Sequence, residues 1–341
     1  MKKEDYKIIN DFFNDVSLEL FNDADIENYY YNFIVLNDNY TNFFKKRYFS
    51  FNSYQNQTRV NNLTFQDVLD ISREVIKSFN PAYIEKFDEL LNSGIIDFSY
   101  DHEYYDSHVL HSFYEGKINE QLININRSFN YSDVETIVHE FMHYVNFTGL
   151  GIRNKIIGEF ISIYFELYTD EYIYKKYKFD SEELFYNNRL INIYASSSDI
   201  LKIEIPLLLY KIFGNLDEES YKLASIFLKK YEKKDYDYEC IETVKIFNKY
   251  SSNEKEDAIT FVLKSHYYVI ATFLAFYFRK KDSLKNIINF IENFNDIGNK
   301  ELSLLELLEK YNLIIGSDLD EVIISSIEEY LDIFEAEKRQ R

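Results

Sequence analysis

The sequence predicts a mostly α-helical protein that carries a small β element beside one of its helices. Only eight glycines and two prolines occur in 341 residues, which favours long helices over a turn-rich β architecture. From residue 131 onward, nearly every segment has the apolar spacing of an amphipathic helix. Two short stretches, 95–100 and 121–126, instead have the pattern of strands. These three observations define the expected fold class.

The composition limits the class of protein. Hydrophobic residues make up 46% of the chain, enough for a sizeable core without disulfides. The formal net charge of −20 disfavours nucleic acid and anionic membrane surfaces as partners, because both would repel an acidic protein. The single cysteine, Cys240, cannot form an intramolecular disulfide and fits a reducing compartment. We therefore expect a cytoplasmic protein.

Neither a secretory nor a membrane-spanning segment is expected. The chain starts with lysines and acids, Met1 to Asp5, and leads into an amphipathic segment instead of the apolar centre of a signal peptide. The most apolar run, 261–278, is interrupted by Lys264, Ser265 and His266. This pattern is typical of a buried helix, and we expect no contact with a membrane.

The first 63 residues form a predicted helical extension. Two helices are expected at 5–22 and 25–50, followed by a polar loop at 51–63. No linker rich in proline, glycine or serine separates this extension from the remainder of the chain. We therefore expect residues 1–63 to pack on a single core unit formed by residues 64–341.

Two helices are expected before the first strand. Thr64 resembles an N-cap, with Asp67 three residues later, and predicts a helix that continues to about residue 78. Pro81 suits the first turn of a second helix, which should end at Gly94. The two strand-like stretches follow.

The remainder of the chain is predicted to be helical. Ser132 or Asp133 is expected to cap the next helix, and Gly149 and Gly151 are expected to end it. Further helices are expected at 153–177, 181–195, 199–213, 217–233, 238–250, 255–280, 282–294, 302–312 and 318–338.

The helix that starts near residue 131 carries the residues with the clearest chemistry. It contains His139-Glu140-Phe141-Met142-His143, in which two histidines stand four residues apart and so project from one helix face. Two imidazoles in this position can hold one Zn²⁺, and the neighbouring glutamate can act on a water at the metal. The motif predicts one zinc ion per chain.

A catalytic zinc site needs a third protein ligand. Glu159 interrupts an otherwise apolar helix, where an unpaired carboxylate would be costly to bury unless a cation lies near it. Glu166 lies two turns further along the same face and is the alternate ligand or a partner of a ligand. We therefore expect His139, His143 and Glu159 to bind the metal, with Glu140 as the catalytic base.

These residues resemble the zinc site of the thimet oligopeptidase and oligoendopeptidase F family. In that family the ligand glutamate is followed by x-x-Ser and by a second glutamate seven residues on, which match Glu159, Ser162 and Glu166. A strand of the family ends in an asparagine thirteen residues before the first zinc histidine, and Asn126 matches it. The resemblance covers about 64–338. It implies a zincin-like helical metallopeptidase core, with a small β element next to the motif helix.

The resemblance also implies a soluble zinc endopeptidase or oligopeptidase that hydrolyses peptide substrates. Glu140 would take a proton from the attacking water and deliver it to the leaving amine. The family places a histidine and tyrosines on a late helix, where they donate hydrogen bonds to the oxyanion. His266 matches the family histidine in one alignment, and Tyr268 matches a family tyrosine in another, so both are candidate catalytic residues.

Two departures from the family pattern favour an alternative function. The family usually has glycine where Met142 stands, and the region before residue 64 is far shorter than its counterpart. A catalytically inactive peptide-binding protein that retains the fold is therefore a second hypothesis. A structural zinc protein fits less well, because structural sites usually have four closed ligands rich in cysteine. The oligomeric state is not predicted.

Three further histidines precede the motif. His108 and His111 have the spacing of a metal pair, but no third ligand accompanies them. We therefore interpret His102, His108 and His111 as residues of a solvated loop or of a segment that lines a partner. The strand at 121–126 is expected to offer its edge to a substrate peptide through backbone hydrogen bonds.

Overall fold

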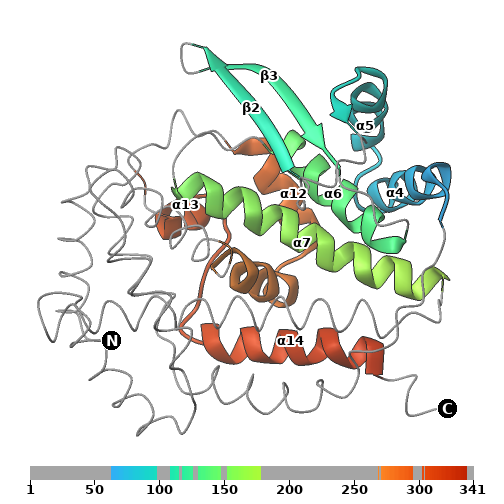
Figure 1. Ribbon diagram of the computed structural model, residues 1–341. Coiled ribbons are helices and arrows are strands. Elements are labelled where there is room, and N and C mark those ends of the chain that lie inside the picture. Colours follow the sequence, from blue (N-terminus) through green and yellow to red (C-terminus); the bar gives the residue numbers. More distant parts are fainter. Residues whose placement is uncertain are drawn as a thin grey trace, which may run out of the picture.

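Figure 1 shows the chain as a computed structural model. The structure describes residues 63–97, 108–114, 117–125, 130–146, 152–177, 268, 270–294, 302 and 304–335. The helices expected before residue 63 and between 178 and 267 lie outside these residues. Within the described part the chain is mostly helical, as predicted. None of the described helices combines the length and the apolarity that a membrane crossing needs.

Helix α4 (Phe65–Phe79) and helix α5 (Tyr83–Asn92) form the first helical pair. The predicted cap is confirmed, since Thr64 and Asp67 exchange side-chain and backbone hydrogen bonds in a capping box. Gly94 has a φ of +71°, the left-handed conformation that favours glycine, just after the end of α5. The apolar faces of α4 and α5 are buried, and α4 packs against the motif helix.

A three-stranded sheet follows, made of β1 (Ile96–Asp97), β2 (His108–Tyr114) and β3 (Lys117–Asn124). The strand order is β1-β3-β2, with β3 parallel to β1 and antiparallel to β2. Strand β2 contacts the motif helix. The small β element therefore lies next to the helix that carries the two histidines.

The sheet corrects two expectations. His108 and His111 lie in strand β2, where the sequence analysis placed a loop, because their backbone pairs with β3. The strand expected to offer a free edge is the central one, since Ile123 pairs with Ile96 on one side and with Val109 on the other. The sequence shows that a stretch alternates like a strand, but it does not show which neighbours pair with it.

Helix α6 (Tyr131–Val145) carries the motif and packs along helix α7 (Ile152–Tyr177). The expectation that Ser132 or Asp133 caps α6 is wrong: the N-cap is Asn130, whose side-chain oxygen accepts a hydrogen bond of 2.8 Å from the backbone N–H of Ser132. Helix α6 therefore begins two or three residues earlier than the expected caps would place it. Helix α7 agrees with the expected helix at 153–177.

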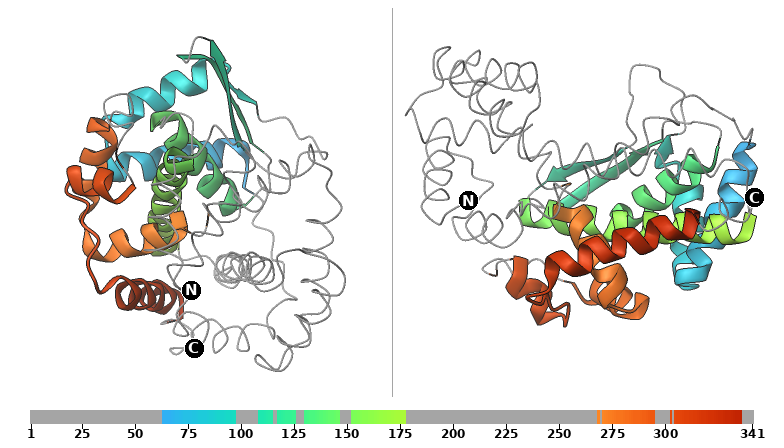
Figure 2. Two further views of the ribbon diagram at one scale, coloured as in Figure 1. Left: turned by 90° about the vertical axis from the view of Figure 1, so that its left-hand side faces the viewer. Right: turned by 90° about the horizontal axis from the view of Figure 1, so that it is seen from below.

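The C-terminal part consists of helical residues 270–281, α12 (Leu284–Asn293), α13 (Leu304–Lys310) and α14 (Leu319–Glu335). Within the described residues, these agree with the helices expected at 255–280, 282–294, 302–312 and 318–338. Figures 1 and 2 show the sheet on one side of α7 and α14 on the opposite side. Helix α7 thus lies at the centre of the described fold.

Polar contacts join α7 to the C-terminal helices. Glu171 accepts a hydrogen bond of 2.7 Å from Nε of Arg279. The hydroxyl of Tyr330 in α14 donates a hydrogen bond of 2.6 Å to the buried Asp170. The ring of Phe160 contacts that of Phe278. Because both faces of α7 are held by packed neighbours, side chains on this helix have well-defined positions.

Candidate metal centre

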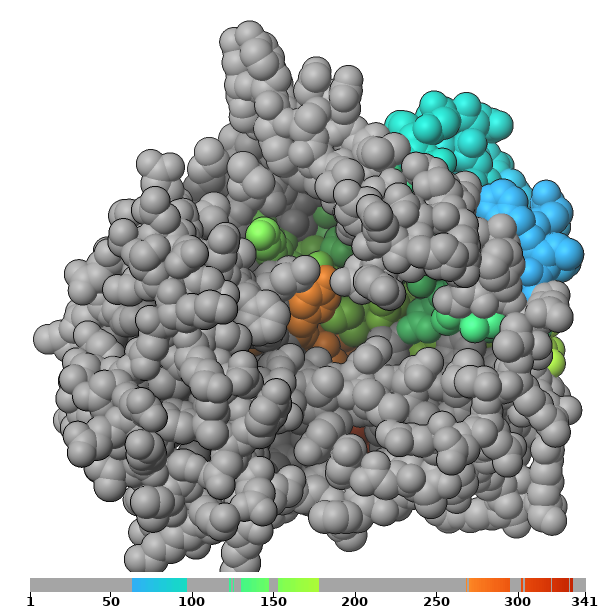
Figure 3. Space-filling model, viewed as in Figure 1, coloured from blue at the N-terminus to red at the C-terminus, as the bar shows by residue number. Residues whose placement is uncertain are grey.

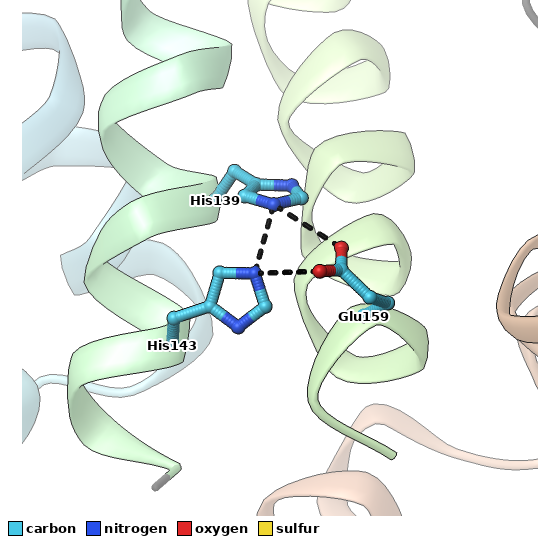
Figure 4. Close-up of side chains that lie close together, drawn as sticks. All are labelled: His139, His143 and Glu159. Carbon is cyan, nitrogen blue, oxygen red and sulfur yellow. Dashed lines mark hydrogen bonds and ion pairs between the residues drawn. The ribbon is translucent and has the colours of Figure 1, made fainter. Parts of the chain in front are cut away.

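The side chains of His139, His143 and Glu159 converge between α6 and α7 (Figure 4). The two histidines stand one turn apart on α6, so their Nε2 atoms lie 3.0 Å from each other. Glu159 projects from α7 toward both: its Oε2 lies 3.6 Å from Nε2 of His139, and its Oε1 lies 3.5 Å from Nε2 of His143. One donor atom from each residue lies within 4.8 Å of the others.

This arrangement fits a metal ion. The two Nε2 atoms and the Glu159 carboxylate face a common point instead of pairing with separate partners. Oε2 of Glu159 is buried and finds no hydrogen-bond partner in the described part of the chain, and burying such an oxygen is costly unless a cation compensates it. The three side chains are 12 to 19% exposed, so an ion held there would be largely shielded from water. His139, His143 and Glu159 could therefore hold a metal ion.

Two further contacts hold His139 in place. Its Nδ1 lies 2.6 Å from Oε1 of Glu166, on the side of the ring away from the other donors. The ring therefore donates Nδ1–H to the carboxylate and leaves Nε2 free to bind a metal. Of the two roles left open for Glu166, this geometry favours the partner of a ligand. The hydroxyl of Ser162 donates a hydrogen bond of 3.1 Å to the backbone carbonyl of His139.

The charges of the site are strongly coupled. Burial lowers the pKa of His139, but Glu166, with Glu140 and Glu159, raises it to about 10 in the metal-free protein. Burial raises the pKa of Glu159, but His143 and His139 and a hydrogen bond from Tyr268 lower it more strongly, so this carboxylate stays ionised. The site thus holds one cationic imidazole against a buried carboxylate.

Glu140 lies beside the two histidines with a different environment. Its side chain is buried, and Oε2 has no hydrogen-bond partner among the described residues. Burial raises its pKa, which His139 and His143 lower and Glu159 and Glu166 raise again, so that the net shift is upward. A buried carboxylate with a raised pKa and an uncommitted oxygen is suited to accept and release a proton. Met142, two residues further along α6, is fully buried in the hydrophobic core.

The late-helix candidates have different outcomes. Tyr268 comes near the ligand group, since its side chain is one of the groups that lower the pKa of Glu159. His266 lies outside the described residues. No local pattern in the sequence reveals that Tyr268 acts on Glu159, because the two residues are distant in the chain. Figure 3 shows atoms of α6, α7 and the C-terminal helical part together on one face of the molecule.

Comparison with known proteins gives two structural likenesses. No family model and no curated protein matches the sequence. The structure of PZ peptidase A with inhibitor 2 has a TM-score of 0.50 and 14% identity, over 88% of this chain and 58% of that one. A candidate oligoendopeptidase F from Bacillus anthracis str. Ames has a TM-score of 0.49 and 13% identity, over 96% of this chain and 62% of that one.

The chain thus spans less than two thirds of the length of either structure. At such low identity, a structural likeness establishes the fold alone. The resemblance seen first in the motif residues is therefore confirmed at the level of structure: the chain is similar in fold to PZ peptidase A.

Proposed function

We propose that the protein is a zinc-dependent metallopeptidase, an endopeptidase or oligopeptidase that hydrolyses bonds in peptide substrates. The observation that carries this proposal is the convergence of His139, His143 and Glu159, with Glu140 buried beside them. Two imidazoles and one carboxylate are a ligand set of catalytic zinc sites, which keep the fourth position open for water or substrate. The fold similarity to PZ peptidase A supports a peptide as the substrate.

The metal ligands, Glu140 and Glu166 have different roles in the proposed hydrolysis. Zn²⁺ held by His139, His143 and Glu159 would supply a Lewis acid that polarises the peptide carbonyl and lowers the pKa of water toward ~7. Glu140 accepts the proton of the attacking water at its uncommitted Oε2 and later delivers that proton to the leaving amine. Glu166 holds the ring of His139 in the tautomer that presents Nε2.

Replacing Glu140 with glutamine tests this mechanism. The amide fills the same space but cannot accept the proton, so cleavage of a fluorogenic peptide should fall by about 10²- to 10⁴-fold. Zinc content, measured by elemental mass spectrometry, should stay at one ion per chain, because Glu140 is not in the ligand group. Glu135→Gln, on the same helix, is the matched control and should cleave as the wild type does.

The outcomes separate the proposal from its rival. Equal cleavage by wild type and Glu140→Gln would show that this glutamate is not the base. A wild type that holds zinc and binds peptides without cleaving them would instead be the inactive peptide-binding protein. Loss of cleavage in the Glu135→Gln control would point to damage of the α6 helix and not to the chemistry of one carboxylate.

A further inference from the structure

Ser162 makes a hydrogen bond that joins two helices. Its side chain is fully buried on α7, one turn after Glu159, and its hydroxyl donates to the backbone carbonyl of His139 on α6 at 3.1 Å. A serine or threonine inside a helix commonly bonds the carbonyl four residues earlier in its own helix. Ser72 and Thr169, which are equally buried, do so at 2.8 and 2.7 Å. Ser162 instead bonds the backbone of a neighbouring helix.

The acceptor of this bond lies in the middle of the metal-binding motif. The carbonyl of His139 belongs to the peptide unit that joins His139 to Glu140. Within the α6 helix this oxygen also accepts the backbone N–H of His143, and its two lone pairs allow both bonds. One oxygen therefore connects the backbone of both histidines to α7, at a position one turn from the third ligand.

The spacing between α6 and α7 decides whether the three ligands can share one ion. The histidines come from α6 and the glutamate from α7, and the oxygens of Glu159 lie 3.6 and 3.5 Å from Nε2 of His139 and His143. Metal–ligand distances in a functional site stay within about 0.2 Å of their usual values. A small displacement of one helix relative to the other would therefore weaken the binding of a metal.

Other contacts between the two helices restrain this spacing less directly. Apolar packing is non-directional, so it allows one helix to slide slightly along the other. The contact between Glu166 and Nδ1 of His139 joins two side chains, whose rotatable bonds can absorb such a movement. The hydroxyl of Ser162 lies one carbon atom from the backbone of α7, and its partner is a backbone atom of α6. It therefore joins the two backbones through a short and directional link.

We propose that Ser162 is a positioning residue that sets the spacing of α6 and α7 at the metal ligands, so that Glu159 meets His139 and His143 at one ion. This inference rests on the proposed function only in that these three residues hold zinc. It places the effect of the hydroxyl on metal binding, because the outer partners of metal ligands act through the ligands that they orient.

Ser162→Ala tests the proposal, since it removes only the hydroxyl. Alanine favours a helix, and the carbonyl of His139 keeps its bond within α6, so we expect the variant to fold. The zinc dissociation constant, measured by competition with a fluorescent chelator, should rise about 10- to 100-fold. A zinc affinity within about twofold of the wild type would overturn the proposal.

Ser72→Ala is the matched control. It makes the same substitution at an equally buried position, where the hydroxyl bonds a carbonyl of its own helix, α4. This variant should bind zinc as the wild type does. If it loses as much affinity as Ser162→Ala, the loss reflects packing in general, and the proposal fails.

Cobalt(II) in place of zinc reports on the arrangement of the ligands, because its visible absorption depends on the coordination geometry. The absorption bands should shift or broaden in Ser162→Ala and should match those of the wild type in Ser72→Ala. A serine that only stabilises the fold would lower the melting temperature without changing this spectrum. An unchanged cobalt spectrum in Ser162→Ala would therefore contradict the proposal.

A double-mutant cycle shows whether Ser162 acts on the helix spacing or on His139 alone. Once Glu159→Ala has removed the ligand on α7, the two histidines bind a metal from a single helix, and the distance to α7 no longer matters. In this background, Ser162→Ala should change the affinity by less than about twofold. The cycle is measured with Cu²⁺, which nitrogen ligands bind more tightly than Zn²⁺. An equal effect in both backgrounds would assign Ser162 to His139 alone and overturn the proposal.

None of these measurements uses a peptide, so this proposal and the proposed function can fail separately. A wild type that binds zinc but cleaves no peptide would refute the peptidase activity, and the metal affinities would still decide the role of Ser162. A wild type that binds no zinc after loading would refute both.

Discussion

The contact between Glu166 and His139 predicts that zinc binding depends strongly on pH. In the metal-free protein, burial lowers the pKa of His139, but Glu166, with Glu140 and Glu159, raises it to about 10. A metal at Nε2 requires a neutral ring, so zinc must displace a proton from His139 at neutral pH. The carboxylate that orients the ligand therefore also sets the free energy of deprotonating it.

The magnitude follows from the raised pKa. A pKa of about 10 lies about 3 units above pH 7, so removing the proton costs about 4 kcal/mol at 1.36 kcal/mol per unit. The zinc affinity should therefore rise about tenfold per pH unit, or about a hundredfold between pH 7 and 9. The ion pair stabilises the metal-free fold fully below about pH 6.5 and loses this effect as the pH rises through about 10. Metal affinity and metal-free stability thus change in opposite directions.

Glu166→Gln is the decisive change. Glutamine keeps an acceptor oxygen for Nδ1–H but removes the charge, so the pKa of His139 falls and fewer protons leave on binding. We expect a slope well below tenfold per pH unit, and at pH 9 an affinity about 10- to 100-fold weaker than that of the wild type. Chelator competition gives the slope, and calorimetry in two buffers of different ionisation enthalpy counts the protons released.

Glu171→Gln is the matched control, because Glu171 lies on the same helix and pairs with Arg279 instead of a histidine. It should keep the wild-type slope. A wild-type affinity that is flat between pH 7 and 9 would refute the reasoning. So would the same slope in Glu166→Gln as in the wild type.

Two further predictions concern the core. Phe141 is 1% exposed, and the centroid of its ring lies 5.3 Å from that of Phe87. Phe141→Ala should therefore lower the free energy of unfolding of the metal-free protein, measured in urea, by about 3 to 5 kcal/mol. A decrease of less than about 1 kcal/mol would contradict this packing. Burial, only partly offset by Tyr330, raises the pKa of Asp170 well above its ordinary value, so the wild type should lose stability as the pH rises above about 4. The melting temperature of Asp170→Asn minus that of the wild type should therefore increase between pH 4 and pH 8. A difference that stays constant over this range would contradict the raised pKa of Asp170.

The sequence contained most of the metal group because its signals are local. His139 and His143 share a helix face through their spacing, and Glu159 stands out as a lone acid in an apolar helix. The capping box of Thr64 and Asp67 was predictable for the same reason, since both partners lie within four residues.

Features that depend on distant partners were not predictable. His108 and His111 have no strand signal of their own, and their strand exists because β3 pairs with it. Asn130, and not Ser132, caps α6 because the direction in which the chain enters the helix decides between neighbouring polar residues. The effect of Tyr268 on the pKa of Glu159 depends on how α7 packs against a segment far along the chain.

Helix α7 carries Glu159, Ser162, Glu166 and Asp170 on one face, and this shared face limits where insertions or deletions can occur in the chain. Each residue adds about 100° of rotation to a helix, so one insertion or deletion between these residues would turn every later one away from its partner. The third ligand, the two supports of His139 and the link to α14 would then be separated in a single step. Homologous chains should therefore keep a fixed residue count from 159 to 170.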